Sequence, residues 1–121
     1  MIPPTLKDNR RYIAFRLLAK QRFTQNQVFQ AIKQTVLSYI GEKGYAHASF
    51  DIVDYDQEKM EGIARATDLT VDDVVFALTL LTDIQGRRAG IVVLGVSGTV
   101  RKAKQKYLGK EIYLKEMPLN K

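Results

Sequence analysis

Residues 89–104 read AGIVVLGVSGTVRKAK and combine a strand, a polar turn and a helix. The apolar run over 89–96 has no charged residue, which is typical of a buried central strand. Ser97, Gly98 and Thr99 form the turn. Residues 100–108 follow with apolar side chains at spacings of three and four. The stretch therefore predicts a central strand that leads directly into an amphipathic helix, which Gly109 ends.

Alternation and helix signals place the other elements upstream of this stretch. Thr24 and Gln27 form a capping-box pattern ahead of an apolar stripe. Thr70 is suited to begin a second helix, whose apolar stripe extends through Leu81 and Ile84. The predicted order is a strand over 10–19, a helix between Thr24 and Gly41, strands over about 46–55 and 59–67, a helix between Thr70 and Gly86, a strand over 89–96 and a helix over 100–108.

This order predicts an α+β fold on the ferredoxin-like, or RRM-like, βαββαβ plan. Such a fold has an antiparallel sheet with two helices on one face, and here an additional C-terminal helix follows. The length of 121 residues suits a single domain over 1–121. We expect a core of about 8–109 and a C-terminal tail over 110–121.

Charge is distributed unevenly along the chain, whose net charge is +6. Residues 1–22 carry +5 and residues 87–121 carry +7, whereas residues 46–86 carry −7. Two basic ends that meet in the fold would form a patch for a polyanion such as RNA. The absence of cysteine excludes disulfides and thiolate metal sites and fits a cytoplasmic location. No apolar run is long enough to span a membrane, so no membrane association is expected.

Basic side chains gather at the two ends of the chain, and we interpret them as an RNA-binding surface. The guanidinium group of arginine donates paired hydrogen bonds to phosphate, and the first N–H groups of a helix can bind an anion. A lysine face that is merely solvated would give the same pattern on the last helix. The RNA-binding candidates are Arg10, Arg11, Arg87, Arg88, Ser97, Thr99, Arg101, Lys102, Lys104 and Lys106.

The second face of the predicted sheet carries Tyr12, Ala14 and Leu18, which we interpret as a protein interface. Standard RNA-recognition motifs stack bases on aromatic residues of the third strand. Residues 60–66 read MEGIARA and contain no aromatic side chain. We therefore expect contacts to the RNA backbone rather than base stacking.

No catalytic or metal site is predicted for the chain itself. Asp51 and Asp54 are three residues apart, so on a regular strand they would point to opposite faces and would not share an ion. His47 is the only histidine and has no nucleophile beside it in the sequence. No nucleophile elbow, P-loop or dinucleotide fingerprint is present. We expect no cofactor bound by this chain.

Two segments carry a resemblance to a known family. Residues 3–15 read PPTLKDNRRYIAF and residues 95–104 read GVSGTVRKAK, with the apolar helix 74–81 between them. This pattern resembles the archaeal ribonuclease P protein component 2 family, which includes a eukaryotic ribonuclease P/MRP subunit. The likeness covers roughly residues 3–109.

The resemblance implies a protein subunit of the ribonuclease P ribonucleoprotein, which removes the 5′ leader of precursor tRNA. It implies that the RNA is the catalyst and that metal ions such as Mg²⁺ act on that RNA. The implied partners are the ribonuclease P RNA, protein component 3, a second copy in a heterotetramer of two component 2 and two component 3 chains, and precursor tRNA as substrate.

Two other functions are compatible with this fold class. An acylphosphatase-like hydrolase would need a glycine-rich phosphate loop after the first strand, but Lys20-Gln21-Arg22-Phe23 contains no glycine. A scaffolding or regulatory module of the same fold would make no RNA contact. Salt dependence separates the latter from an RNA-binding subunit, because phosphate contacts release counterions.

Overall fold

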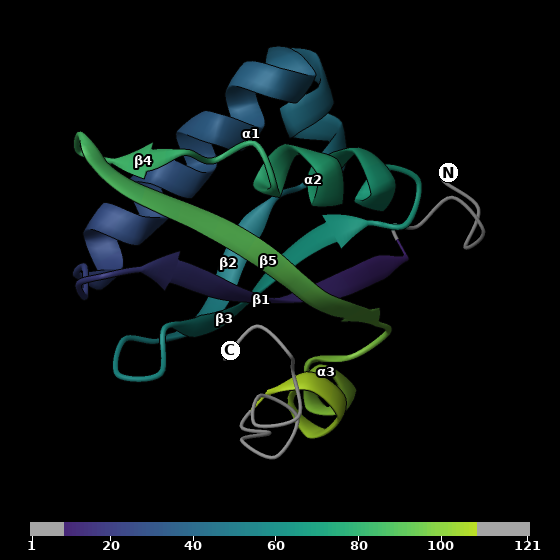
Figure 1. Cartoon of the computed structure of the whole chain (residues 1–121). Coiled ribbons are helices and arrows are strands. Elements are labelled where there is room, and N and C mark those ends of the chain that lie inside the picture. Colours follow the sequence, from purple (N-terminus) through teal and green to yellow (C-terminus); the bar gives the residue numbers. More distant parts are fainter. Residues whose placement is uncertain (1–8, 109–121) are drawn as a thin grey trace.

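The computed structural model describes residues 9–108 (Figure 1). A five-stranded sheet is combined with three helices. The elements are β1 Arg10–Ala19, α1 Gln25–Ala48, β2 Asp51–Asp56, β3 Glu61–Thr67, α2 Val71–Leu78, β4 Asp83–Ile84, β5 Arg87–Ser97 and α3 Val100–Tyr107.

The sheet has the strand order β2-β3-β1-β5-β4, and every neighbouring pair is antiparallel. Helices α1 and α2 cover one face, whereas α3 lies on the other side of the sheet (Figure 1). Without the short β4, this is the arrangement of a ferredoxin-like βαββαβ fold. The predicted fold class is therefore confirmed, including the additional helix after the last long strand.

The main core lies between the sheet and the pair α1 and α2. On β1, Ile13, Phe15 and Leu17 alternate toward this side, as period two requires, and all three are buried. The helices contribute the buried side chains of Val28, Ile32, Val36, Val74, Ala77 and Leu78. Because β1 pairs with β3 on one side and β5 on the other, it forms the centre of the sheet.

Helix α1 begins as the sequence predicts, but a second helical segment extends it beyond the predicted end. The Gln27 N–H donates to Thr24 Oγ1, and the Thr24 N–H donates to Gln27 Oε1, which completes the capping box. Gly41 has φ 77° and ψ 171°, which are not helical, so the first helical segment of α1 ends at the predicted glycine and a second segment follows the kink. The helix continues to Ala48, where Ser49 forms a left-handed cap. The second strand was therefore predicted about five residues too early.

The second helix was predicted too long. Helix α2 ends at Leu78, and the chain then forms a tight hairpin between β4 and β5. Gln85 and Gly86 both have positive φ, at 53° and 80°, as a type I′ turn requires. Ile84 is buried from β4 just as it would have been from a helix. The spacing of hydrophobic residues alone could not distinguish a long helix that includes Ile84 from a short helix followed by β4.

The Tyr55 hydroxyl supplies a prediction about alkaline stability. It is buried and makes no hydrogen bond within the described residues, and burial followed by the charge of Asp56 raises the pKa of Tyr55 to about 12. The folded state disfavours the phenolate, so stabilisation that is present below pH 10 should be lost as pH rises toward 12. We expect Tyr55→Phe to change the free energy of unfolding by less than about 1 kcal/mol at pH 8.

Denaturant unfolding at pH 8 and pH 11 measures this effect. The free energy of unfolding should fall less between pH 8 and pH 11 in Tyr55→Phe than in the original protein. Tyr39→Phe is the control, because Tyr39 is exposed on α1. If the free energy of unfolding falls equally at alkaline pH in all three proteins, the effect does not come from the Tyr55 hydroxyl.

Candidate nucleic-acid interface

Helix α3 begins with a well-formed cap. The Thr99 side chain accepts a hydrogen bond from the Lys102 N–H at 3.0 Å, and the Thr99 carbonyl accepts one from the Ala103 N–H. The first N–H groups of a helix have no partner within the helix, and the helix dipole makes this end positive. The start of α3 is therefore suited to an anion.

The opposite side of α3 is fixed against the second face of the sheet. Ala103 is completely buried and so are Ala14 and Ile63, although none of the three belongs to the main core. A Cβ built on Gly95 would overlap the Tyr107 ring, so the ring packs directly on the backbone of β5. This packing leaves Arg101, Lys102 and Lys106 exposed.

The N-terminal arginines lie at the same end of the sheet as the start of α3. Tyr12 is paired with Ser97, so Arg10 and Arg11 lie beside the turn that follows β5. A Cβ built on Gly98 would lie 4.0 Å from Arg11 Nη1. We define the α3 patch by the accessible residues gathered here, namely Arg10, Arg11, Thr99, Arg101 and Lys102. Ser97, also predicted to bind RNA, is buried at 8% exposed.

Arg87 and Arg88 do not join this patch. They lie at the other end of β5, where Ala19 is paired with Ala89. The 11 residues of β5 span about 35 Å at a rise of about 3.3 Å per residue. Lys20 and Arg88 line a groove of about 480 Å³ at this end, and the sequence prediction did not include Lys20. We define the hairpin patch as Lys20, Arg87 and Arg88.

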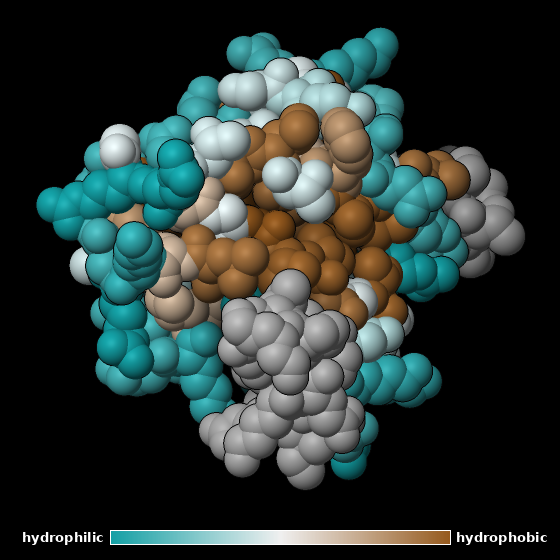
Figure 2. All heavy atoms as spheres, in the orientation of Figure 1, coloured by the Kyte–Doolittle hydropathy of each residue, from teal (hydrophilic) through white to brown (hydrophobic). Residues whose placement is uncertain are grey.

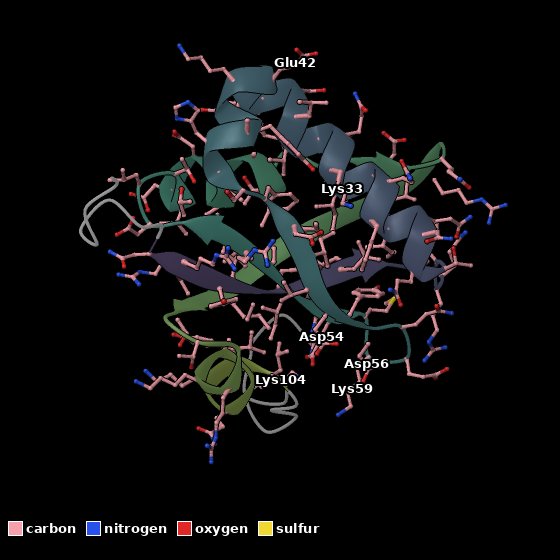
Figure 3. The ribbon with its side chains drawn as sticks, turned by 180° about the vertical axis from the view of Figure 1, so that it is seen from behind. Lys33, Glu42, Asp54, Asp56, Lys59 and Lys104 are labelled. Atoms are coloured by element: carbon pink, nitrogen blue, oxygen red, sulfur yellow. The ribbon has the colours of Figure 1, made fainter. Side chains whose placement is uncertain are left out.

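Lys104 differs from the other basic residues of α3. Its Nζ lies 2.9 Å from Asp54 Oδ2, and Figure 3 shows the two side chains meeting between α3 and β2. Lys104 is one of the residues predicted to bind RNA, and in the structure its ammonium is paired within the chain. The pair is about half exposed, so its contribution to stability is small. Its main effect is to neutralise this side of α3.

The three residues predicted as a protein interface have different environments. Ala14 is 0% exposed beneath α3, so its assignment to an interface is wrong. The prediction failed because it assumed that the second face of the sheet is open, whereas α3 packs on it. Tyr12 is partly buried, and Leu18 is 53% exposed beside Lys20. For these two residues an interface stays a prediction.

The acidic cluster on β2 also departs from the predicted geometry. A β-bulge lies between Ile52 and Asp54, so that Asp51 is paired with Arg65 and Asp54 with Ile63. Arg65 and Ile63 are two residues apart, which places Asp51 and Asp54 on the same face rather than opposite faces.

These carboxylates have cationic neighbours within the chain. Asp51 lies 3.7 Å from Lys33 Nζ and 3.9 Å from Arg65 Nη2. Asp56 caps the next turn by accepting from the Glu58 and Lys59 N–H groups. Within residues 9–108, no group of three acidic or histidine side chains is arranged to hold a metal ion.

The Gly95–Tyr107 contact leads to a prediction about the position of α3. Gly95→Ala should force Tyr107 off the sheet and lower the free energy of unfolding by roughly 1–3 kcal/mol. Most of this cost should disappear in a Tyr107→Ala background, because the two residues are in direct contact. Urea denaturation of the two single variants and the double variant measures the coupling.

Gly90→Ala is the matched control for this experiment. A Cβ at Gly90 would meet only the Leu81 carbonyl, at 3.9 Å, which is ordinary contact distance. Equal costs for Gly95→Ala in the presence and absence of Tyr107 would contradict the packing described here.

Comparisons with known proteins give a consistent result. A family model described as the Rpp14/Pop5 family matches residues 11–108. Ribonuclease P protein component 2 of Pyrococcus furiosus is 42% identical over 107 residues, which cover 88% of this chain and 89% of that protein. The protein of the same name from Methanocaldococcus jannaschii is 40% identical over 108 residues, covering 89% of this chain and 79% of the relative.

A solved structure also resembles this chain. One chain in a cryo-EM structure of yeast ribonuclease MRP matches with a TM-score of 0.60 and 12% sequence identity. The match covers 94% of this chain and 95% of the yeast chain. At this identity the likeness establishes a shared fold. Among residues 9–108, no helix is both long and apolar enough to cross a membrane.

Proposed function

Because this chain belongs to the Rpp14/Pop5 family, we propose that it is a protein subunit of ribonuclease P that binds the RNA of the complex. The observation that carries RNA binding is the α3 patch. Residues from the two ends of the described chain, Arg11 and Gly98 among them, lie together beside a capped helix start. Within this patch, Arg10 and Arg101 have exposed side chains.

The patch favours recognition of the RNA backbone. Arginine forks and the N–H groups at the start of α3 are both suited to phosphate oxygens. Helix α3 occupies part of the sheet face on which RRM proteins stack bases, and the residues beneath it, Ala14 and Ile63, are small or aliphatic. We therefore propose binding by charge and shape, with little reading of base identity.

The wider assembly is also a proposal. The names of the relatives support a ribonuclease P complex. From the sequence resemblance we propose that the RNA of this complex is the catalyst, helped by metal ions such as Mg²⁺, and that it removes the 5′ leader of precursor tRNA. We propose protein component 3 as a partner, in a heterotetramer with two copies of each chain. An archaeal source among the relatives fits a cytoplasmic location.

Neutralising the α3 patch should weaken RNA binding. We expect Arg101→Ala with Lys102→Ala to reduce the slope of log affinity against log salt by about 1–2, because each lost phosphate contact removes roughly one released ion. Binding to the ribonuclease P RNA at several salt concentrations measures this. The fold should stay intact, since both side chains are exposed.

Lys104→Ala is the matched control on the same helix. Its ammonium is already paired with Asp54, so its removal should change the slope less than either exposed residue. An unchanged slope in the double variant would remove the electrostatic basis of the proposal. It would favour a scaffolding module without RNA contact.

The chain alone should not cleave precursor tRNA. Within residues 9–108, no group of acidic or histidine side chains is placed to hold a metal ion, and His47 is exposed. Cleavage assays with the isolated protein, before and after the RNA and component 3 are added, measure the expected gain. Cleavage by a preparation shown to be free of RNA would overturn the assignment of catalysis to RNA.

A further inference from the structure

The outer edge of β5 lacks a partner strand over much of its length. Beyond its pairing with β1, β5 pairs with β4 only at Arg87 and Arg88. The Ala89 N–H then donates to the Thr82 carbonyl at 3.0 Å, on the β4 side. Backbone groups alternate between the two sides of a strand, so Ile91 and Val93 direct their N–H and C=O groups to this same side.

No described residue pairs with the backbone of Ile91 or Val93 at this edge. In Figure 1, β5 lies at the front of the sheet, and no described strand lies beside it beyond β4. An unpaired strand edge is a template for another strand, because its hydrogen-bonding groups are already aligned. A segment that binds at this edge must therefore adopt an extended, strand-like conformation.

The surface around this edge is apolar. Figure 2 shows a continuous hydrophobic area over α2 and β5. Large exposed hydrophobic side chains on these elements include Phe76 from α2, Leu80 from the segment after it, and Val92 and Val96 from β5. Apolar areas of this kind on a soluble domain mark interaction sites. These apolar side chains around the edge of β5 can therefore contact and bury the side chains of an added strand.

We propose that the outer edge of β5 binds an extended segment of a partner protein, which adds a strand to the sheet. The segment would carry apolar side chains toward both faces of the sheet, because Phe76 lies on the side of α2 whereas Val92, paired with Arg16, lies on the side of α3. It would be acidic at the end nearest Arg87 and Arg88, where β4 already pairs with β5. This proposal does not depend on RNA contact, so it can fail or succeed separately from the proposed function.

Charge argues against a second copy of this chain at the same edge. Two β5 strands paired antiparallel around a two-fold axis would bring Arg87 and Arg88 of one copy toward the start of α3, with Arg101 and Lys102, in the other. The two-fold axis would repeat this like-charge contact at both ends of the strand pair. An acidic segment makes favourable contacts where a second copy makes repulsive ones.

Amide hydrogen exchange of the full chain tests the proposal. In the free protein, the Ile91 and Val93 amides should exchange faster than those of Gly90 and Val92, which face β1. A short peptide of alternating valine and threonine, flanked by glutamates, should slow exchange at Ile91 and Val93 by about tenfold or more. The same peptide with a central proline should give no protection, because proline cannot continue the hydrogen-bond ladder.

Two lysine variants provide the matched comparison. Val92 and Val53 are both 37% exposed, but Val53 lies on β2, at the opposite edge of the sheet. Val92→Lys should weaken peptide binding about tenfold, whereas Val53→Lys should leave it unchanged. A lysine-flanked peptide should bind more weakly than the glutamate-flanked one to the unaltered protein.

Three outcomes would overturn the proposal. The first is absence of protection at Ile91 and Val93 at saturating peptide. The second is slow exchange at both amides in a free protein that sedimentation shows to be a dimer, with Val92→Lys restoring the monomer, since a second copy would then cover the edge. The third is slow exchange in a free monomer, which would mean that the chain covers its own edge.

Discussion

Burial of β1 on both faces is the constraint on which the rest of the structure depends. Ile13 and Phe15 contact the core beneath α1 and α2, while Ala14 between them lies under α3. A small residue at this position lets a helix approach the sheet closely, and Gly95 and Ala103 serve the same purpose. The strand that holds the fold together thereby also fixes α3 beside the arginines at its own beginning.

The uneven charge of the sequence has a structural explanation. Carboxylates from the acidic middle of the chain face cations across the sheet, as Glu61 does with Arg16, Asp51 with Arg65 and Asp54 with Lys104. Glu61 and Arg16 form the most buried of these pairs, where an unpaired charge would be costly. The acidic segment thus neutralises the centre of the second face, and positive charge remains at the two ends of the sheet.

Local patterns in the sequence were sufficient for the order of the long elements but not for the short β4 or the interface. The order of elements and the basic helix follow from caps and periodicity, which involve residues close together in the chain. The sequence analysis gave Arg88 and Arg10 as candidates for the same function, and the pairing of β1 with β5 places them at opposite ends of the sheet. Asp54 was assigned to the wrong face because the bulge in β2 depends on pairing with β3. In each case the missing information was a contact between distant segments.

The two margins of the sheet differ, and this limits how copies of the chain can associate. The β2 margin is interrupted by its bulge and carries Asp51 and Asp54, features that discourage strand pairing. Among the strands of residues 9–108, only β5 then has an edge open to pairing with another strand. Open-ended growth needs two receptive margins on every subunit, so that each addition creates a place for the next. A molecule with one strand edge open to pairing cannot extend further once a strand has been added there. This favours discrete complexes over fibres.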